Sequence, residues 1–340
     1  MKVFIFGAGA SKASQIDELR PSRKSPLVDE LFDDVYHTWA EMVGLTKVEL
    51  DDCMENIRKI GSLEKWLTDR WEKISTYKTP RTQDSEKYFF GKVTLYIWLT
   101  LLKISETYNE KNLYYTFLRK LKKADEEYGI ISFNYDLLLD RAIQDVCGYT
   151  LGSIQVYIHK ARYIKPHGSV NWLVPKRIDD PKIQSEYHLE TRVRLDMSSE
   201  NMFKDKPLSL NGLQIIEPTH RDLHEVDHMI KRFNDQYFYP IILMPLTIKQ
   251  YNQIEDFQET IIENGKKLIS EAQEIYLIGY RGKDKTIDDF LRKARKGTKL
   301  YVIGRNDTLG IAKNITSRHR QLSIKPHGNR SFEQFVEQYI

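Results

Sequence analysis

The sequence KVFIFGAGAS at residues 2–11 joins a short apolar run directly to a glycine-rich turn. Residues Val3 to Phe6 are all β-branched or aromatic, a composition typical of a buried strand, and Gly7 ends the run. Because Gly7 and Gly9 have no Cβ, the backbone of this turn can approach another group closely. The stretch predicts the first strand of a sheet, followed by a tight turn into a helix.

Further apolar runs follow along the chain and alternate with segments of helical spacing. Strands that are separated by helices predict parallel β-α units. We therefore expect an α/β fold class with a doubly wound parallel sheet. The predicted strands are residues 2–6, Tyr128–Phe133, one or two strands within 154–166, Glu274–Ile278 and Lys299–Ile303.

Two segments interrupt this alternation. From Leu27 to about Lys123 apolar residues recur at spacing four, and no strand pattern occurs. Residues 175–240 are rich in Ser, Asp, Asn and Pro and are irregular. We expect a parallel-sheet domain at residues 1–30 and 126–340, a helical insertion at 31–125, and a second, irregular insertion at 175–240 that covers a cleft.

Composition narrows the class of protein. The chain has 340 residues, of which 41% are hydrophobic, so it can bury a large core. Its 52 Lys and Arg nearly balance 48 Asp and Glu, so charge does not indicate nucleic acid binding. The two cysteines, Cys53 and Cys147, exclude a disulfide framework and a four-cysteine zinc site. No apolar run suits a membrane helix, and the N-terminus does not resemble a signal peptide. We expect a cytoplasmic, soluble protein.

The glycine turn lies where ligands bind in doubly wound sheets, at the carboxyl end of the first strand. Gly7 and Gly9 would let a pyrophosphate approach, and Ser11 could offer it a hydroxyl. The third glycine of the usual dinucleotide fingerprint is replaced by Lys12. The turn therefore predicts phosphate binding, with a tight turn that holds no ligand as the alternative.

Polar residues also follow two later strands. Asn134 and Asp136 follow Phe133, and His167 lies in a Pro-His-Gly-Ser turn. Asn134 or Asp136 could instead cap the next helix, and a lone histidine is often structural. Because the carboxyl ends of parallel strands share one edge of the sheet, we expect these groups and the glycine turn to meet in one cleft.

Four motifs occur in order: GAGAS (7–11), SFNYD (132–136), KPHGSVNW (165–172) and IGYRGKDKTIDDFL (278–291). Together they resemble the bacterial sirtuin-like NADase family of antiphage defence systems. The resemblance covers roughly residues 1–310 and leaves both insertions unmatched. It implies a Rossmann-like domain that binds NAD as its substrate and needs no metal.

The resemblance also implies roles for individual residues. Asn134 would position the ribose and a water molecule, Asp136 would lie near the nicotinamide, and His167 would act as the base. The phosphates would contact Gly7, Ala8, Gly9 and Ser11, and the adenosine would lie beside Gly279-Tyr280 and Gly304-Arg305-Asn306.

The activity that this resemblance implies is hydrolysis of NAD to nicotinamide and ADP-ribose, in an abortive-infection effector. The related deacylases carry a four-cysteine zinc module, which this chain cannot form, so a deacylase is disfavoured. An NAD or ADP-ribose sensor, or a regulatory subunit without catalysis, is the main alternative. Because an unregulated NADase would kill its host, we expect gating by a homo-oligomer or by a partner such as a HerA-type ATPase.

One further pattern is a histidine stripe in THRDLHEVDH, where His220, His224 and His228 recur at spacing four. On a helix these three imidazoles would share one face and could bind a metal ion. An exposed polar helix face explains the same spacing, and we prefer that interpretation.

Overall fold

The computed structural model divides into two compact units, which are described separately. Unit 1 consists of Met1–Leu27, Thr107–Ser169 and Gln258–Ile340, and unit 2 of Val28–Glu106 and Val170–Phe257. The described residues are 1–15, 19–77, 79–177, 208–209, 213–216, 236–243, 254–280, 285–305, 307–325 and 330–338.

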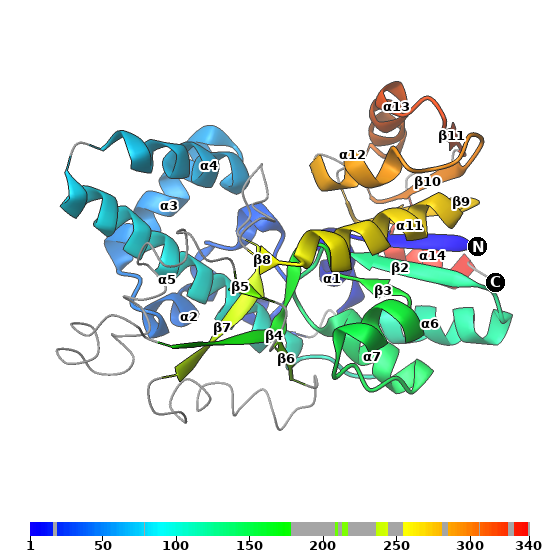
Figure 1. Cartoon of the computed structure of the whole chain (residues 1–340), viewed down its shortest axis with the longest axis horizontal. Helices are drawn as coiled ribbons and strands as arrows, with labels where there is room; N and C mark the ends of the chain where they lie inside the picture. Colours follow the sequence, from blue (N-terminus) through cyan, green and yellow to red (C-terminus); the bar gives the residue numbers. More distant parts are fainter. Residues whose placement is uncertain are drawn as a thin grey trace. The chain divides into compact units, whose positions relative to one another are not determined.

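Unit 1 is built on a parallel sheet of six strands (Figure 1). Their order across the sheet is β11-β10-β9-β1-β2-β3. Numbered along the chain, this is the order 3-2-1-4-5-6 of dinucleotide-binding folds. The prediction of an α/β fold with a doubly wound, Rossmann-like sheet is confirmed. The strands are β1 (Lys2–Phe6), β2 (Tyr128–Ser132), β3 (Tyr163–Ile164), β9 (Glu274–Ile278), β10 (Lys299–Ile303) and β11 (Ser323–Ile324).

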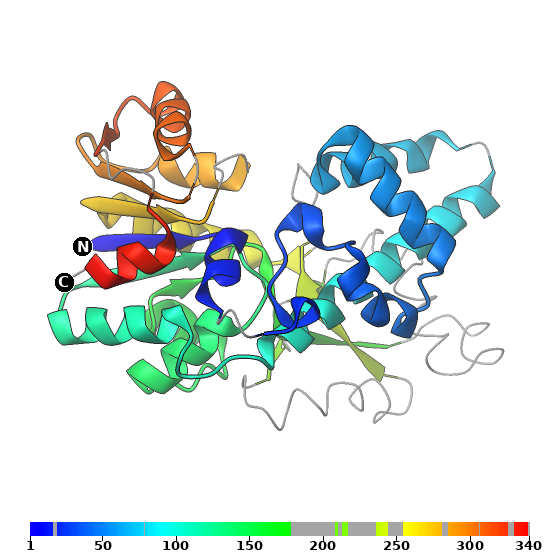
Figure 2. The same cartoon turned by 180° about the vertical axis from the view of Figure 1, so that it is seen from behind.

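Helices cover both faces of this sheet, with α6 and α14 on one face and α11 and α12 on the other (Figures 1 and 2). On the first face, Phe4 packs against Phe117 of α6, with ring centroids 5.0 Å apart. On the other, Gly129 of β2 lies so close to Leu268 of α11 that a Cβ would be 2.7 Å from its side chain. The helices of unit 1 are α1 (Ala8–Ser14), α6 (Leu113–Ala124), α7 (Leu138–Cys147), α11 (Glu263–Glu271), α12 (Lys285–Leu291), α13 (Thr308–Arg318) and α14 (Phe332–Gln338), with a 3₁₀ turn at Pro21–Arg23 and π-helical turns at Val156–Lys160 and Gln258–Ile262.

Unit 2 combines helices with short strands. Strand β4 pairs antiparallel with β6, and the indole Nε1 of Trp98 on α5 donates to the carbonyl of Val170 on β4 at 2.8 Å. Thr46 and Glu49 form a capping box that begins α3. The elements are α2 (His37–Met42), α3 (Lys47–Ile60), α4 (Leu63–Lys73), α5 (Pro80–Ser105), β4 (Gly168–Arg177), β5 (Leu208–Ser209), β6 (Gln214–Ile215), β7 (Gln236–Ile242) and β8 (Ile254–Glu255), with 3₁₀ turns at Val28–Glu30, Asp34–Tyr36 and Ile74–Thr76.

The unit boundaries differ from the expected domains. Helix α6 was expected in the insertion at 31–125 but belongs to unit 1, because its apolar face packs on the parallel sheet. The helical segment and residues 170–257 form one unit rather than two insertions. Most of the expected irregular insertion at 175–240, including the histidine stripe, lies outside the described residues. Among the helices that are described, none is long and apolar enough to cross a membrane.

Candidate functional site

Four loops of unit 1 come together at the carboxyl edge of the sheet, after β1, β2, β3 and β9. Strands β1 and β9 are neighbours, although more than 250 residues separate them along the chain. The strand order reverses between these two strands, so this is the switch point at which doubly wound sheets bind ligands. The contacts between the four loops define the site.

The glycines of the first turn pack against the loop after β9. The Gly7 amide donates to the carbonyl of Ile278, and the Gly9 amide donates to the carbonyl of Gly279, both at 3.0 Å. Gly279 has φ +63°, and a Cβ there would lie 2.2 Å from the Ala10 amide nitrogen. Both amides are therefore used inside the fold. A Cβ on Gly7 or Gly9 would lie 2.8 or 2.9 Å from the carbonyl oxygen of Gly279, so the close packing of the two loops requires glycine at both positions.

Asn134 ties the loop after β2 to this glycine turn. Its side-chain amide donates to the carbonyl of Gly7 at 3.0 Å and to the Ser11 hydroxyl at 2.8 Å. The Ser11 hydroxyl, which is fully buried, also lies 3.2 Å from the Tyr114 hydroxyl on α6. In this structure Asn134 and Ser11 hold the first turn in place. The role of Tyr114 was not predicted, because nothing in the sequence links it to residues a hundred positions away.

Asp136 is buried beneath the same turn. One of its carboxylate oxygens accepts from the amide of Leu138, at the start of α7, at 3.1 Å. The N-cap of α7 is Leu137, so Asp136 binds the first helical amide from the residue before the N-cap rather than as the N-cap that the sequence left open. Burial raises the pKa of Asp136 above its ordinary value, while the charge of Lys165 and a hydrogen bond from Ser11 act in the opposite direction. Asp136 therefore stabilises the loops around the site from within the fold.

A buried ion pair, which the sequence analysis missed, supports the histidine turn. The ammonium of Lys165 is fully buried and lies 3.0 Å from Asp140. It also donates to the Ser169 hydroxyl at 2.7 Å and to the Asp136 carbonyl at 2.8 Å. Asp140 in turn accepts hydrogen bonds from two tyrosine hydroxyls, those of Tyr157 and Tyr163. The network fastens both ends of the turn at 165–169 to α7.

His167 lies at the tip of this turn. Gly168 has φ +82°, and its amide donates to the carbonyl of Lys165 at 3.1 Å, so the chain reverses sharply there. The imidazole lies against Phe133, with ring centroids 4.9 Å apart. Phe133 in turn contacts the ring of Tyr280 at 5.0 Å. Ring contacts thus connect His167, after β3, to the loop after β9.

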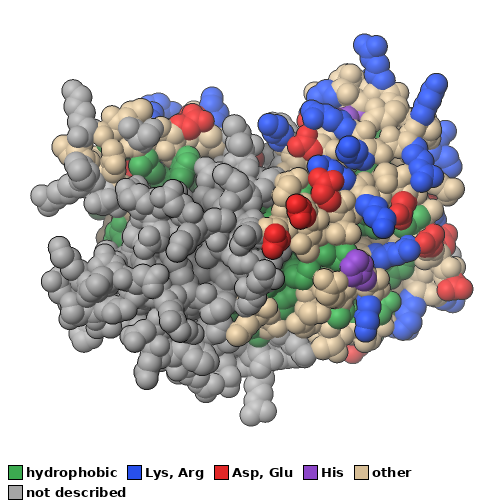
Figure 3. Space-filling model, viewed as in Figure 1, with side chains coloured by type: hydrophobic (Ala, Val, Ile, Leu, Met, Phe, Trp, Pro, Cys, Tyr) green, Lys and Arg blue, Asp and Glu red, His purple; other side chains and the backbone are tan. Residues whose placement is uncertain are grey.

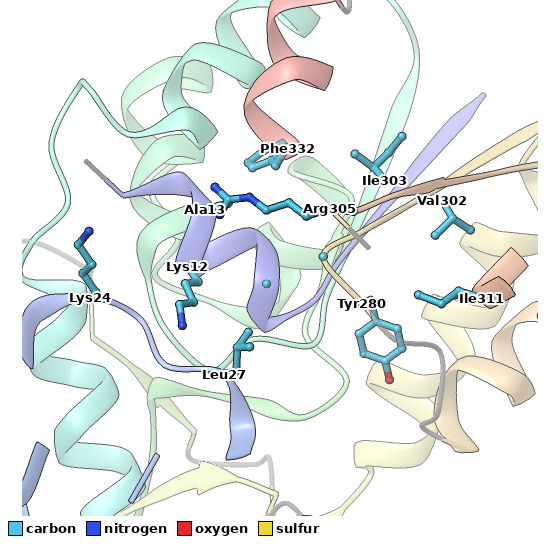
Figure 4. Close-up of a pocket in the computed structure, with 13 residues that line it drawn as sticks. Lys12, Ala13, Lys24, Leu27, Tyr280, Val302, Ile303, Arg305, Ile311 and Phe332 are labelled. Carbon is cyan, nitrogen blue, oxygen red and sulfur yellow. The ribbon is translucent and has the colours of Figure 1, made fainter. Parts of the chain in front are cut away.

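A pocket of about 430 Å³ lies beside the glycine turn. Figure 4 shows the side chains of Lys12 and Lys24 on one side, with Arg305 reaching from the end of β10 toward Ala13. Cationic and apolar groups thus share one cavity of a size that suits a small ligand. The lining residues are Gly9, Lys12, Ala13, Lys24, Leu27, Gly279, Tyr280, Val302, Ile303, Gly304, Arg305, Ile311 and Phe332.

The expected site residues fall into three groups. Gly9, Gly279, Tyr280 and Gly304 line the pocket. Gly7, Ala8, Ser11, Asn134, Asp136 and His167 lie at the same edge of the sheet but do not line it. Asn306 lies outside the described residues.

On the face of unit 1 that Figure 3 shows, cationic and acidic side chains of the described residues occur together. In the space-filling view, Lys and Arg side chains over α11–α13 are interspersed with Asp and Glu (Figure 3). Arg292, for example, pairs with Asp289 at 2.8 Å. Within the described part of the chain, no cluster of His, Cys, Asp and Glu could hold a metal ion.

Comparison with protein-family models and with curated proteins finds no match to this chain.

Proposed function

We propose that unit 1 binds NAD and hydrolyses the bond between nicotinamide and ribose, releasing nicotinamide and ADP-ribose. One observation carries this proposal: a pocket with cationic and apolar walls opens at the switch point of a sheet with the strand order of dinucleotide-binding folds. The four motifs that resemble sirtuin-like NADases supply the residues around it.

The pocket is complementary to the adenosine diphosphate half of NAD. Val302, Ile311 and Phe332 supply apolar surface for an adenine ring. Lys12 and Lys24 supply positive charge for the pyrophosphate. Gly9, Gly279 and Gly304 also line the cavity, and none of them has a side chain that would limit the approach of a phosphate. The nicotinamide half would then point toward Tyr280 and Phe133, in the direction of His167.

The chemistry of NAD explains why such a site needs no paired carboxylates. The pyridinium leaves with the electrons of the C–N bond and becomes neutral nicotinamide, so no general acid is needed. The ribosyl carbon develops positive charge and is attacked by water, whose proton must go to a base. His167 is suited to accept it, because the ordinary pKa of imidazole is near neutrality. A positioned base contributes about 10²–10⁴ in rate.

Asn134 and Asp136 would support this step indirectly. Asn134 bonds the glycine turn to the loop after β2, and that loop carries Phe133, which contacts His167. We therefore assign Asn134 a positioning role in addition to any contact with the ribose hydroxyls. Asp136 would hold the start of α7 and, through its carbonyl, the ammonium of Lys165.

A second candidate is a protein that binds NAD or ADP-ribose without cleaving it. It is favoured by the burial of His167, which is 5% exposed, and by the engagement of Asn134 and Ser11 inside the fold. A sensor needs the pocket but no base. Release of nicotinamide therefore separates the two candidates.

On the resemblance to antiphage effectors, we propose that hydrolysis serves defence by depleting NAD and that assembly controls it. Either a homo-oligomer or a HerA-type ATPase partner would switch the activity on. Comparing the turnover of the purified chain alone with that of the chain after assembly tests this. Equal turnover in the two states would exclude control by assembly.

The direct test incubates the purified chain with NAD and follows nicotinamide and ADP-ribose by chromatography. We expect release by the native chain and loss of at least about 100-fold in His167→Ala. His159→Ala is the matched control, because His159 is exposed on the π-helical turn of the same unit. Native circular dichroism must be checked for each variant. Unchanged release in folded His167→Ala would refute the assignment of the base.

A further inference from the structure

The charged side chains that line the pocket beside the glycine turn are all cationic. Three cations line it, namely Lys12, Lys24 and Arg305, and no carboxylate is found among the lining residues that the structure describes. The pyrophosphate of NAD carries two negative charges. A ligand with an additional phosphate would match this set of cations better.

The position of the arginine indicates where that phosphate lies. Arg305 comes two residues after β10, which is the second strand from β1 across the switch point. It begins at the edge of the cavity, and its side chain reaches across toward Ala13 on α1 (Figure 4). In the proposed pose the pyrophosphate lies at the glycine turn, and the adenine contacts Val302, Ile311 and Phe332. A ribose in this pocket would therefore lie near Gly304 and Arg305.

The chemistry of the side chain also favours a phosphate over a ribose hydroxyl. Sites that hold the two free hydroxyls of the ribose use a carboxylate that accepts hydrogen bonds from them, whereas an arginine accommodates a 2′-phosphate. The planar guanidinium donates two parallel hydrogen bonds to phosphate oxygens. A ribose phosphate adds about 1.5–2 negative charges at neutral pH, with which the guanidinium of Arg305 can pair.

We propose that Arg305 binds a phosphate on the 2′-oxygen of the adenosine ribose, so that the site prefers NADP and 2′-phospho-ADP-ribose over NAD and ADP-ribose. This inference rests on the proposed nucleotide site but does not depend on catalysis. It assigns the specificity of the pocket to one side chain at the end of β10.

The test measures binding of ADP-ribose and 2′-phospho-ADP-ribose by isothermal titration calorimetry, because neither compound has a nicotinamide to lose. We expect the 2′-phosphorylated compound to bind about 10- to 100-fold more tightly, as for a hydrogen bond between charged groups. Arg305→Gln should remove that difference and leave the affinity for ADP-ribose within about 3-fold. Arg305→Lys should retain part of it.

Arg292→Gln is the matched control, because Arg292 is exposed in the same unit, with its guanidinium on Asp289. It should bind both compounds like the native chain. The 3′-phosphate isomer separates the two ribose positions, and equal binding of the 2′ and 3′ isomers would overturn the assignment.

The possible failures are distinguishable. If the native chain releases nicotinamide from NAD but binds both ADP-ribose compounds equally, this inference fails and the proposed function stands. If the chain binds neither compound and cleaves neither NAD nor NADP, the proposed function itself fails. Retention of the preference in Arg305→Gln would also refute the role of Arg305.

Discussion

The buried ion pair beneath the histidine turn offers the sharpest test of how this site is held together. Replacing Lys165 with methionine removes the ammonium but keeps a flexible side chain of similar length. The structure gives that ammonium three partners: Asp140 at 3.0 Å, the Ser169 hydroxyl at 2.7 Å and the Asp136 carbonyl at 2.8 Å. Both members of the pair are fully buried, so water does not replace the lost partner.

The expected cost follows from these contacts. Breaking a buried pair by removing one partner leaves a charge without compensation and destabilises a protein by about 3–5 kcal/mol. Methionine fills the space of the lysine stem, so a cavity adds little to this figure. We therefore expect Lys165→Met to destabilise unit 1 by about 3–5 kcal/mol.

The assay must report on unit 1 in particular. All five tryptophans of the chain, at positions 39, 66, 71, 98 and 172, lie in unit 2. Tryptophan fluorescence in urea therefore follows unit 2 and serves as an internal reference. Hydrogen exchange of peptides that cover Tyr128–Cys147 follows β2 and α7 of unit 1. We expect Lys165→Met to reduce protection in these peptides.

A second variant distinguishes the loss of the ion pair from a general destabilising effect of the substitution at Lys165. Tyr157 and Tyr163 donate to different oxygens of Asp140, so Asp140→Asn keeps an acceptor for one of the two hydroxyls while it removes the charge. Added to Lys165→Met, it should recover at least about 1 kcal/mol, because no isolated charge remains. A cost below about 1 kcal/mol for Lys165→Met alone, or a double variant no more stable than the sum of the single changes, would refute the reasoning.

Three other predictions concern the same unit. Gly279→Ala should lower the free energy of unfolding in urea by more than about 3 kcal/mol, because its Cβ would lie 2.2 Å from the Ala10 amide nitrogen. Gly148→Ala should lower it by only about 1 kcal/mol, because Gly148 has φ +75° but open space around it. Equal losses would show that the loops after β1 and β9 do not pack as described. Burial raises the pKa of Asp136, so its carboxyl group stays protonated to higher pH in the native state than in the unfolded state. The contribution of Asp136 to the free energy of unfolding therefore falls as pH rises from the ordinary carboxyl pKa to the raised native pKa. Asp136→Asn should remove that slope from unfolding measured across a pH series, and a native chain whose stability relative to this variant rises with pH over the same range would contradict the sign. Ellman's reagent should react rapidly with one thiol, that of half-buried Cys147, because Cys53 is buried and its pKa is raised to about 12; two rapid equivalents would be inconsistent with the burial of Cys53.

The strands could be predicted because their signal is local. The expected strands at residues 2–6, 274–278 and 299–303 coincide with β1, β9 and β10, and β2 ends one residue before the expected Phe133. Each is a short, mostly apolar run with β-branched and aromatic residues, and a glycine or a polar residue ends it. The secondary structure of residues 154–166 was harder to predict, because a π-helical turn at Val156–Lys160 precedes the two residues of β3. A short apolar run of this kind fits a helix or a strand equally well.

The boundary between the two units could not be predicted from the same patterns. The periodicity of α6 is that of any amphipathic helix, and it does not reveal which surface the apolar face covers. Only the packing of Phe117 against Phe4 and Phe6 places this helix on the parallel sheet. The helical insertion was expected to end at residue 125 because helical spacing gives way there to the apolar run of the next strand.

The candidate site was predictable in its location but not in its contacts. Glycines and polar residues after successive strands indicated the carboxyl edge of the sheet, because parallel strands end there together. The sequence did not show that Gly9 packs against Gly279, or that the amide of Asn134 is engaged by Gly7 and Ser11.

By itself, the sequence determined the fold class, the first glycine turn and the residues that follow each main strand, since these depend on near neighbours along the chain. The tertiary structure alone decided which of those residues line a cavity and which support it. Asn134 meets Ser11 across 123 positions, and Lys165 meets Asp140 across 25. Such pairs form only when separate strands and helices pack together, and no local pattern records which distant partner a buried polar group will find.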